Sequence, residues 1–298
     1  MWIKEPGWIT DRILFLGRKE SCVYLTGQDE HTIIGGGLAY IVPELLTQLD
    51  RYGIDRDRIT RLLILHAHFD HVGVVSHLQN TFPNLRVIGS PRAKELLSRD
   101  DVANTIIDMN RGMFAANGME TEARDVILEP IRMDETVTGG DLVTWGGVDF
   151  EIIDAPGHSS CSIAAYMPEE KALFASDAGG IPFGDMIFAA GNSNFTEYQQ
   201  TLKRFSAYDV DIHLAEHYGA FTDEEGRTFM GRSIQSAKET RKILEDAYRK
   251  TGNIAESTGL VTEAFTAGSE GYFLPRPVME MVIGQMMRHI AKTMDASG

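Results

Sequence analysis

The strongest chemical signal in the sequence is a group of four metal-binding side chains within six residues. His66, His68, Asp70 and His71 directly follow the apolar run at residues 62–65. That run is too short for a helix by itself and predicts a buried strand. His66 and His68 are two residues apart, so in extended backbone their side chains leave the same face. Imidazole and carboxylate groups bind zinc, iron and similar ions, so this stretch predicts a metal site.

The segments around this group place it at a junction between a strand and a helix. Val72, Val75 and Leu78 follow at helical spacing, which predicts a helix over residues 71–81 that stops before Pro83. Ligand sites in layered α/β proteins lie at such strand ends. The alternative is a His-rich polar loop without function, but this spacing is far more constrained than a lone histidine.

The spacing His-x-His-x-Asp-His resembles the signature of the metallo-β-lactamase superfamily. Three later segments match that family in the same order, each after an apolar strand: Gly157-His158, Asp177 and His217-Tyr218-Gly219. The resemblance implies an α/β fold, the metallo-β-lactamase αββα sandwich, here with a C-terminal helical extension. We expect the sandwich to span residues 1–222 and a helical tail, residues 223–298, to pack over the active site.

The same resemblance implies a site for two divalent metal ions, zinc or iron. The family's ligands map onto seven residues: His66, His68 and His158 for the first metal, Asp70, His71 and His217 for the second, and Asp177 as the bridge. Asp70 is also the expected catalytic residue. Two cations would lower the pKa of a bridging water, giving hydroxide near neutral pH. Without a thiolate in the set, the sequence does not separate two zincs, two irons and a mixed pair.

Two other residues compete for the last ligand position. His213 lies four residues before His217, and Glu216 is adjacent to it. We favour His217 because it precedes the turn at the strand end, where the family has its ligand. The chain departs from the family at residues 35–37, where three glycines stand in place of an Asp-x-Gly segment. This departure affects the support of the metal loop more than metal binding itself.

Strand and helix patterns outside the metal motifs agree with a sandwich. Strands are expected at residues 12–17, 21–26, 31–34, 86–90, 210–215 and in a run over 141–176; helices at 42–52, from Pro91, over 100–126, at 194–207 and from 223 onward, with breaks near Gly252 and at 268–277. Residues 178–194 contain four glycines and no clear period. We expect them to form a loop at the mouth of the site.

Charge and composition limit the class of partner. The chain of 298 residues has a formal charge of −15 and is 43% hydrophobic, which is ordinary for a soluble globular protein. The charge argues against nucleic acid, whose phosphates bind clustered Lys and Arg. We expect no membrane span, because no apolar segment is long enough, and no signal peptide, because the first residues contain no apolar stretch of that kind. We therefore expect a cytoplasmic protein with a small-molecule substrate and buried free thiols at Cys22 and Cys161; a homodimer stays open.

The ligand set favours the glyoxalase II-like hydrolase branch over secreted β-lactamases and flavin-linked diiron reductases. A thiolate of pKa roughly 8.5 leaves with little help, whereas an alkoxide needs an acid or a metal. The spare histidines lie in no acid motif beside the site: His31, His77, His213 and His289. A thioesterase is therefore favoured. The alternatives are a lactonase or phosphodiesterase on the same site, or a metal-bearing signalling or interaction protein whose hydrolysis is incidental.

Features beyond the metal motifs are most similar to the PqsE-type thioesterases, the quinolone-signal response proteins. They are Pro6-Gly7, the helical insertion at residues 100–126 and Phe273-Leu274-Pro275 in the tail. This resemblance implies a tail over the site and a coenzyme A thioester as substrate. The Met-rich insertion and tail either line an acyl pocket or pack as ordinary helices. Coenzyme A would need a basic patch, for which the tail offers Arg227, Arg232, Arg241 and Lys242.

Overall fold

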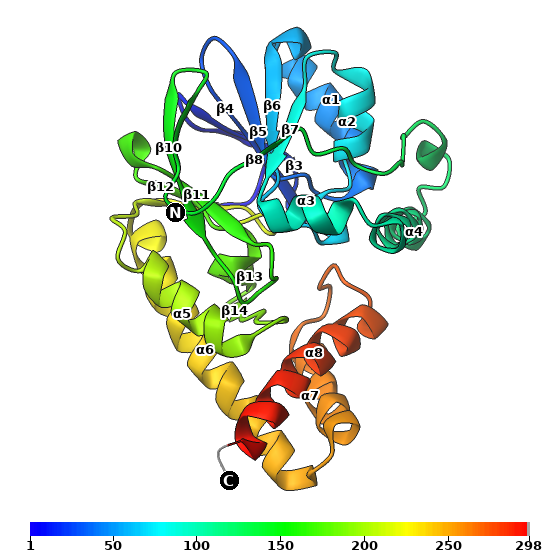
Figure 1. Ribbon diagram of the computed structural model, residues 1–298, viewed down its shortest axis with the longest axis vertical. Helices are drawn as coiled ribbons and strands as arrows, with labels where there is room; N and C mark the ends of the chain where they lie inside the picture. The colour runs from blue at the N-terminus through cyan, green and yellow to red at the C-terminus, as the bar shows by residue number, and fades with distance from the viewer. Residues whose placement is uncertain (297–298) are drawn as a thin grey trace.

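Two mixed seven-stranded sheets form the centre of the protein (Figure 1). The structure is a computed structural model and describes residues 1–296. The first sheet has strand order β2-β3-β4-β5-β6-β7-β8. Its strands are β2 (Gly7–Thr10), β3 (Ile13–Arg18), β4 (Ser21–Thr26), β5 (His31–Ile34), β6 (Ile59–Leu63), β7 (Arg86–Gly89) and β8 (Glu135–Thr136). The pairs from β5 to β8 are parallel.

The second sheet has strand order β1-β16-β15-β12-β11-β10-β9. Its strands are β1 (Trp2–Ile3), β9 (Leu142–Trp145), β10 (Val148–Asp154), β11 (Ile163–Met167), β12 (Ala172–Phe174), β15 (Ile212–Leu214) and β16 (Ala220–Phe221). The N-terminal strand β1 pairs antiparallel with β16. The start of the chain therefore belongs to the sheet that the second half of the sequence builds.

Helices cover the outer faces of both sheets, which gives the expected αββα order (Figure 1). The first sheet carries α1 (Val42–Arg51), α2 (Val75–Thr81), α3 (Pro91–Leu97) and α4 (Asp100–Ala116). The second carries α5 (Phe195–Phe205) and α6 (Asp223–Thr251). Short 3-10 turns join these elements: η1 (Ala39–Ile41), η2 (Arg56–Arg58), η3 (Phe69–His71), η4 (Glu122–Arg124), η5 (Pro168–Glu170) and η6 (Ser176–Gly179).

The strand β3 shows why the sheets lie between helices. Its side chains alternate between two apolar cores, as the two-residue period of a strand requires. Ile13 and Phe15 pack between the sheets, while Leu14 and Leu16 pack under the helices. Each of the four is fully buried. A strand that is apolar on both faces is stable only in the middle of a layered fold.

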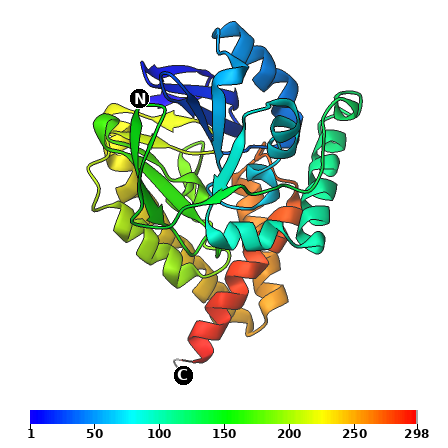
Figure 2. The ribbon, with the colours of Figure 1, turned by 45° about the horizontal axis from the view of Figure 1, so that its top comes forward.

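The C-terminal helices extend from one end of the sandwich (Figure 2). Helix α6 is followed by α7 (Ile254–Gly268) and α8 (Arg276–Asp295), with breaks at the positions that the sequence predicts. Ile283, Met287 and Ile290 of α8 are buried in one core with Phe195 and Leu202 of α5. The tail thus shares apolar packing with the second sheet's helical layer. The division of the chain at residue 222 stays a prediction.

Three sequence expectations differ from the structure in detail. The helix expected over residues 71–81 begins only at Val75, because the preceding residues form the turn that carries the metal-binding side chains. The helix expected over 100–126 ends at Ala116, before Gly118 in a left-handed conformation. The loop expected over 178–194 was wrong in part: it contains the hairpin β13 (Ile181–Phe183) and β14 (Met186–Phe188), turned at Gly184.

Two further expectations concern cysteines and membranes. Cys22 and Cys161 are both buried and free, as expected. Within residues 1–296, no helix combines the length and the apolar character that crossing a membrane requires.

Candidate metal centre

Four strand ends bring the seven predicted ligands to one end of the sandwich. After β6, the chain runs through His66 and His68 into η3, which contains Asp70 and His71. The others follow strands of the second sheet: His158 after β10, Asp177 in η6 after β12, and His217 after β15. All except His68 are less than one-tenth exposed. The two halves of the sequence thus meet at this end.

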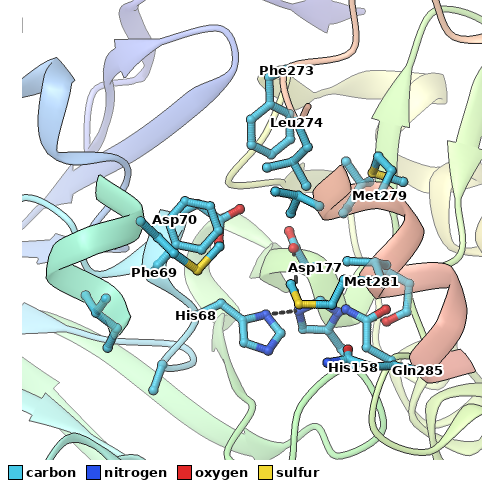
Figure 3. Close-up of a pocket in the computed structure, with 18 of the residues that line it drawn as sticks. His68, Phe69, Asp70, His158, Asp177, Phe273, Leu274, Met279, Met281 and Gln285 are labelled. Atoms are coloured by element: carbon cyan, nitrogen blue, oxygen red, sulfur yellow. Dashed lines mark hydrogen bonds and ion pairs between the residues drawn. The ribbon is translucent and has the colours of Figure 1, made fainter. Parts of the chain in front are cut away.

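Three histidines form the first group. The Nε2 atom of His158 lies 3.2 Å from Nε2 of His66 and 3.0 Å from Nδ1 of His68, and Figure 3 shows the second of these contacts. Burial and the neighbouring His158 lower the pKa of His68 to about 3. A neutral imidazole is the protonation state that binds a metal, so three ring nitrogens converge in a form suited to one ion.

Asp70, His71 and His217 form the second group. Nε2 of His71 and Nε2 of His217 are 3.0 Å apart, and Oδ2 of Asp70 lies 3.5 Å from the latter. Asp177 stands between the two groups, with Oδ2 3.2 Å from Nε2 of His71 and 3.5 Å from Nε2 of His158. A carboxylate in this position can contact a cation in each group.

Contacts outside the cluster fix the orientation of four of the rings. Each Nδ1 atom faces an acceptor: His71 faces Oε2 of Glu216 at 2.9 Å, His158 the Ala190 carbonyl at 2.7 Å, His217 the Glu20 carbonyl at 2.6 Å, and His66 Oγ of Ser176 at 3.2 Å. An acceptor at Nδ1 assigns the proton to that atom when the ring is neutral. The Nε2 lone pairs then point at one another. Such an arrangement repels itself unless a cation lies between the rings, so these residues fit a metal centre.

The carboxylates of the cluster also attract positive charge. Burial raises the pKa of Asp70, but His71 and His217 outweigh burial and bring it to about 2. The same balance holds the pKa of Asp177 well below its usual value. In the opposite direction, burial lowers the pKa of His71, and the surrounding carboxylates, Asp177 first, raise it well above the usual range. Divalent cations would satisfy these ionised acids in the same way.

Glu216 supports the metal loop in a way that the sequence analysis missed. Its carboxylate accepts hydrogen bonds from Nδ1 of His71 and from Oγ of Ser176. A Cβ atom at Gly35 would lie 2.2 Å from Oε1 of Glu216, and Gly35 has φ +86°. The first glycine of the triplet therefore leaves room for the acid. The sequence signal was the absence of the family's Asp-x-Gly segment, because the loop then needs an acid from elsewhere, here from the segment after β15.

The other competitor for the last ligand position lies outside the cluster. The ring of His213 stacks on Phe229 with centroids 3.8 Å apart. Burial lowers its pKa to about 3, and neither ring nitrogen has a partner among the described residues. The structure thus brings His217 into the cluster and leaves His213 in the helix–sheet core.

A cavity of about 270 Å³ opens over the cluster, and we call it the apolar chamber. Its walls come from helix α4, from the segment before α8 and from α8 itself (Figure 3): Val102, Ile106, Met109, Phe273, Leu274, Val278, Met279 and Met281. His68, Asp70, His158 and Asp177 form its floor. From the sequence, the Met-rich insertion and the tail could either line an acyl pocket or pack as ordinary helices. In the structure, both line the cavity over the candidate site.

The tail touches the cluster itself through one aromatic ring. Phe273 stacks on His217 with centroids 4.3 Å apart. The backbone N–H of Phe273 donates a hydrogen bond to the hydroxyl of Tyr218 at 3.1 Å. This contact holds the segment between α7 and α8 against the strand-end loop that carries His217.

The basic patch expected for coenzyme A is not beside the cluster. All four expected cations have acidic neighbours: Arg227 contacts Asp211 and Glu224, Arg232 contacts Glu225, Arg241 contacts Glu245, and Lys242 contacts Asp246. None of the four lines the apolar chamber. The expectation was wrong because these residues lie along α6, where acids of the same helix, and Asp211 for Arg227, form ion pairs with them.

Comparisons with known proteins agree with the fold and the motifs. Residues 17–217 match the model of the metallo-β-lactamase superfamily, and the chain belongs to that superfamily. A metallo-β-lactamase family protein of Thermus thermophilus has the same fold, with a TM-score of 0.68 over 96% of this chain and 93% of that one, at 15% identity. The family membership and the fold class predicted from the sequence are confirmed.

The curated relatives include hydrolases of thioesters. Acyl-coenzyme A thioesterase MBLAC2 of Gallus gallus is 25% identical over 83% of this chain and 90% of the relative. A hydroxyacylglutathione hydrolase of Rhizobium meliloti is 28% identical over 63% of this chain and 60% of its own. An atrochrysone carboxyl ACP thioesterase of Aspergillus fumigatus is 21% identical over 80% and 64%. The narrower resemblance to PqsE-type proteins stays a prediction.

Proposed function

We propose that this protein is a metal-dependent hydrolase that cleaves an acyl thioester. The observation that carries the proposal is the buried His and Asp cluster at the floor of an apolar chamber. The three relatives named above have different thiol carriers in their names, coenzyme A, an acyl carrier protein and glutathione. A thioester is the chemistry common to them, which supports the reaction class without selecting the carrier.

We assign the seven cluster residues as ligands of two divalent metal ions, zinc or iron. His66, His68 and His158 would hold one ion, Asp70, His71 and His217 would hold the other, and Asp177 lies within reach of both groups. The metal ions, when bound, supply Lewis acidity and lower the pKa of water. The chain's own contribution is orientation, since Nδ1 of His71 donates to Glu216 and Nδ1 of His158 donates to the Ala190 carbonyl.

The apolar chamber binds and shields the acyl group in this proposal. Side chains of α4 and α8 line it, so an acyl chain placed there is removed from water next to the cluster. Asp70 at its floor has a pKa of about 2 and is ionised at neutral pH, so it can accept a hydrogen bond from an attacking water. Among the described residues, the only histidines that line this chamber are His68 and His158, both in the cluster. Of the spare histidines, His289 does line a neighbouring cavity, contrary to the expectation, but burial lowers its pKa and its Nε2 accepts the Thr196 N–H, so it has no proton at that atom to offer a leaving group. A leaving group that needs no proton, such as a thiolate, fits such a site.

The tail, residues 223–298, acts as the cover of the sandwich in this proposal. Phe273 stacks on His217, and Met279 and Met281 face the cluster from α8 (Figure 3). The sandwich then supplies the chemistry, and the tail selects the acyl group.

A matched substrate panel on metal-analysed protein tests the reaction class. We expect an acyl thioester to be hydrolysed with a higher kcat/KM than the oxygen ester of the same acyl group, a lactone or a phosphodiester. Equal or faster turnover of phosphodiesters or lactones would contradict the thioester assignment and leave the metal site intact. Slow turnover of every substrate, with two metal equivalents bound, would favour the interaction protein over the enzyme.

A further inference from the structure

A second cavity, of about 520 Å³, adjoins the apolar chamber at His68 and His158, and we call it the basic chamber. The two cavities share five lining residues: Ala67, His68, His158, Asn192 and Gln285. His68 and His158 therefore stand at the point where the cavities meet. A substrate bond held at the cluster would have one end in each cavity.

The two cavities differ in charge. Helix α8 gives the basic chamber Arg288, His289 and Lys292, and no Asp or Glu of the described chain lines it. The apolar chamber contains Asp70, Asp101 and Asp177. Arg288 and Lys292 are exposed and four residues apart on one helix, where like charges repel. In a chain of net charge −15, a cavity with two cations and no carboxylate is suited to an anion.

Neither cation has an acidic partner among residues 1–296. Within residues 1–296, Arg288 and Lys292 form no ion pair, in contrast to Arg227, Arg232, Arg241 and Lys242 of α6. The charge of the basic chamber is therefore available to a ligand. Partly exposed cations of this kind bind phosphate or carboxylate groups with energies that salt reduces.

A buried amide at the boundary of the cavities points to the same ligand. Asn192 is 7% exposed and lines both cavities. Its Oδ1 atom has no hydrogen-bond partner among the described residues. A buried acceptor without a partner is unfavourable, and an N–H group of a bound ligand would supply the missing bond.

We propose that the basic chamber binds the anionic thiol carrier of the substrate, a phosphate-bearing pantetheine such as coenzyme A, while the apolar chamber binds the acyl group. This inference rests on the proposed thioesterase function. The carrier's amide, close to its sulfur, donates its N–H to Oδ1 of Asn192, and its phosphates lie against Arg288 and Lys292. Glutathione offers carboxylates to the same cations, so the experiment compares the two carriers.

The experiment reverses two charges in each of two variants. The test variant is Arg288→Glu with Lys292→Glu. The matched control is Lys238→Glu with Lys250→Glu, two exposed lysines of α6 that form no ion pair among the described residues and line neither chamber. Both variants change the net charge equally. The substrates are one acyl group on coenzyme A, on N-acetylcysteamine, which lacks phosphate, and on glutathione.

We expect the ratio of kcat/KM for the coenzyme A thioester to that for the N-acetylcysteamine thioester to fall about tenfold in the test variant, as for the loss of partly exposed charge contacts. The ratio should be unchanged in the control. An unchanged ratio in the test variant, or an equal fall in both variants, would overturn the inference. A fall seen only with the glutathione thioester would assign the chamber to carboxylate carriers and overturn the phosphate assignment.

Binding of free coenzyme A separates this inference from the proposed reaction. Calorimetric titration should show binding to the unmodified protein and about tenfold weaker binding to the test variant, whether or not any thioester is hydrolysed. If no thioester is cleaved but this difference is seen, the reaction class fails and the carrier site stands. If thioesters are cleaved but coenzyme A binds both proteins equally, the carrier site fails alone. Replacing Arg288 and Lys292 with Gln repeats the comparison without added negative charge.

Discussion

The sandwich and the helical tail contribute to the candidate site in different ways. The sandwich supplies all seven ligand candidates from strand ends, and four of the rings have a second contact at Nδ1. The tail supplies cavity walls, through Phe273 and one side of α8. Its residues are held by apolar packing instead of hydrogen bonds to the cluster. The chemistry therefore depends on side chains that face the cluster and are also held by a second contact. Substrate selection depends on cavity walls that can change without moving a metal ligand.

The largest expected effect on metal content and activity comes from replacing Asp177, which lies between the two ligand groups of the sandwich. Asp177→Ala removes the carboxylate between the two groups, so at least one metal equivalent should be lost, together with nearly all hydrolysis. Metal analysis and kcat/KM measure the two effects. Asp185→Ala, an exposed acid in the β13–β14 hairpin, is the matched control and should retain both. Two full equivalents of metal in the Asp177 variant would show that the bridge was wrongly assigned.

Replacing Glu216, which contacts the ligand His71 from outside the cluster, should have a smaller effect on metal binding. Glu216→Gln keeps the side chain's size but removes the charge that faces Nδ1 of His71. Outer-shell partners of metal-binding histidines typically change metal affinity by about 10- to 100-fold. Competition with a chelator measures this loss, and the fold should stay intact by circular dichroism. Metal affinity equal to that of the unmodified protein would mean that His71 is positioned without Glu216.

A substitution in the tail should change substrate binding and leave the metal content unchanged. Phe273→Ala removes the ring that stacks on His217 at 4.3 Å, a contact of the kind worth roughly 0.5–1.5 kcal/mol beyond its area. Phe273 also lines the apolar chamber, so the substitution removes an apolar contact to the acyl group, and we expect KM for the thioester to rise by about three- to tenfold, with two metal equivalents retained. Loss of a metal in this variant would contradict the separation of roles. A point substitution is preferred to deleting residues 270–298, because Ile283, Met286 and Met287 are fully buried and their loss would unfold the helical layer.

The smallest expected effect is at His213, the histidine that the cluster excludes. The ring nitrogens of His213 have no hydrogen-bond partner among the described residues. His213→Leu puts an apolar side chain in the same core position. Removing buried polar groups without partners stabilises a protein by about 1 kcal/mol, so the melting temperature should rise slightly and metal content stay constant. His217→Leu is the paired variant and should lose metal. If His213→Leu instead lost metal, the last ligand position would have to be reassigned.

Several properties followed from the sequence because they depend on local spacing. His66, His68, Asp70 and His71 belong to one turn, so their proximity needs no knowledge of the rest of the chain. The strand expected at residues 12–17 and the helix breaks at Gly252 and residues 268–277 are likewise local. Family membership could be predicted for the same reason, since each motif is short and their order is fixed along the chain.

Other properties depended on contacts between distant segments, and only the tertiary structure decided them. Glu216 meets His71 across 145 residues, and Phe273, which follows α6 and α7 along the chain, stacks on His217. The basic patch shows the same limit. The sequence suggested four cations of α6 and none of α8. Acids of α6, and Asp211 for Arg227, form ion pairs with the cations of α6, whereas α8 brings Arg288 and Lys292 to a cavity beside the cluster. The net charge of a cavity depends on which helices and strands pack around it. The spacing of residues along the sequence therefore determined the metal ligands, and tertiary packing determined the cavity walls.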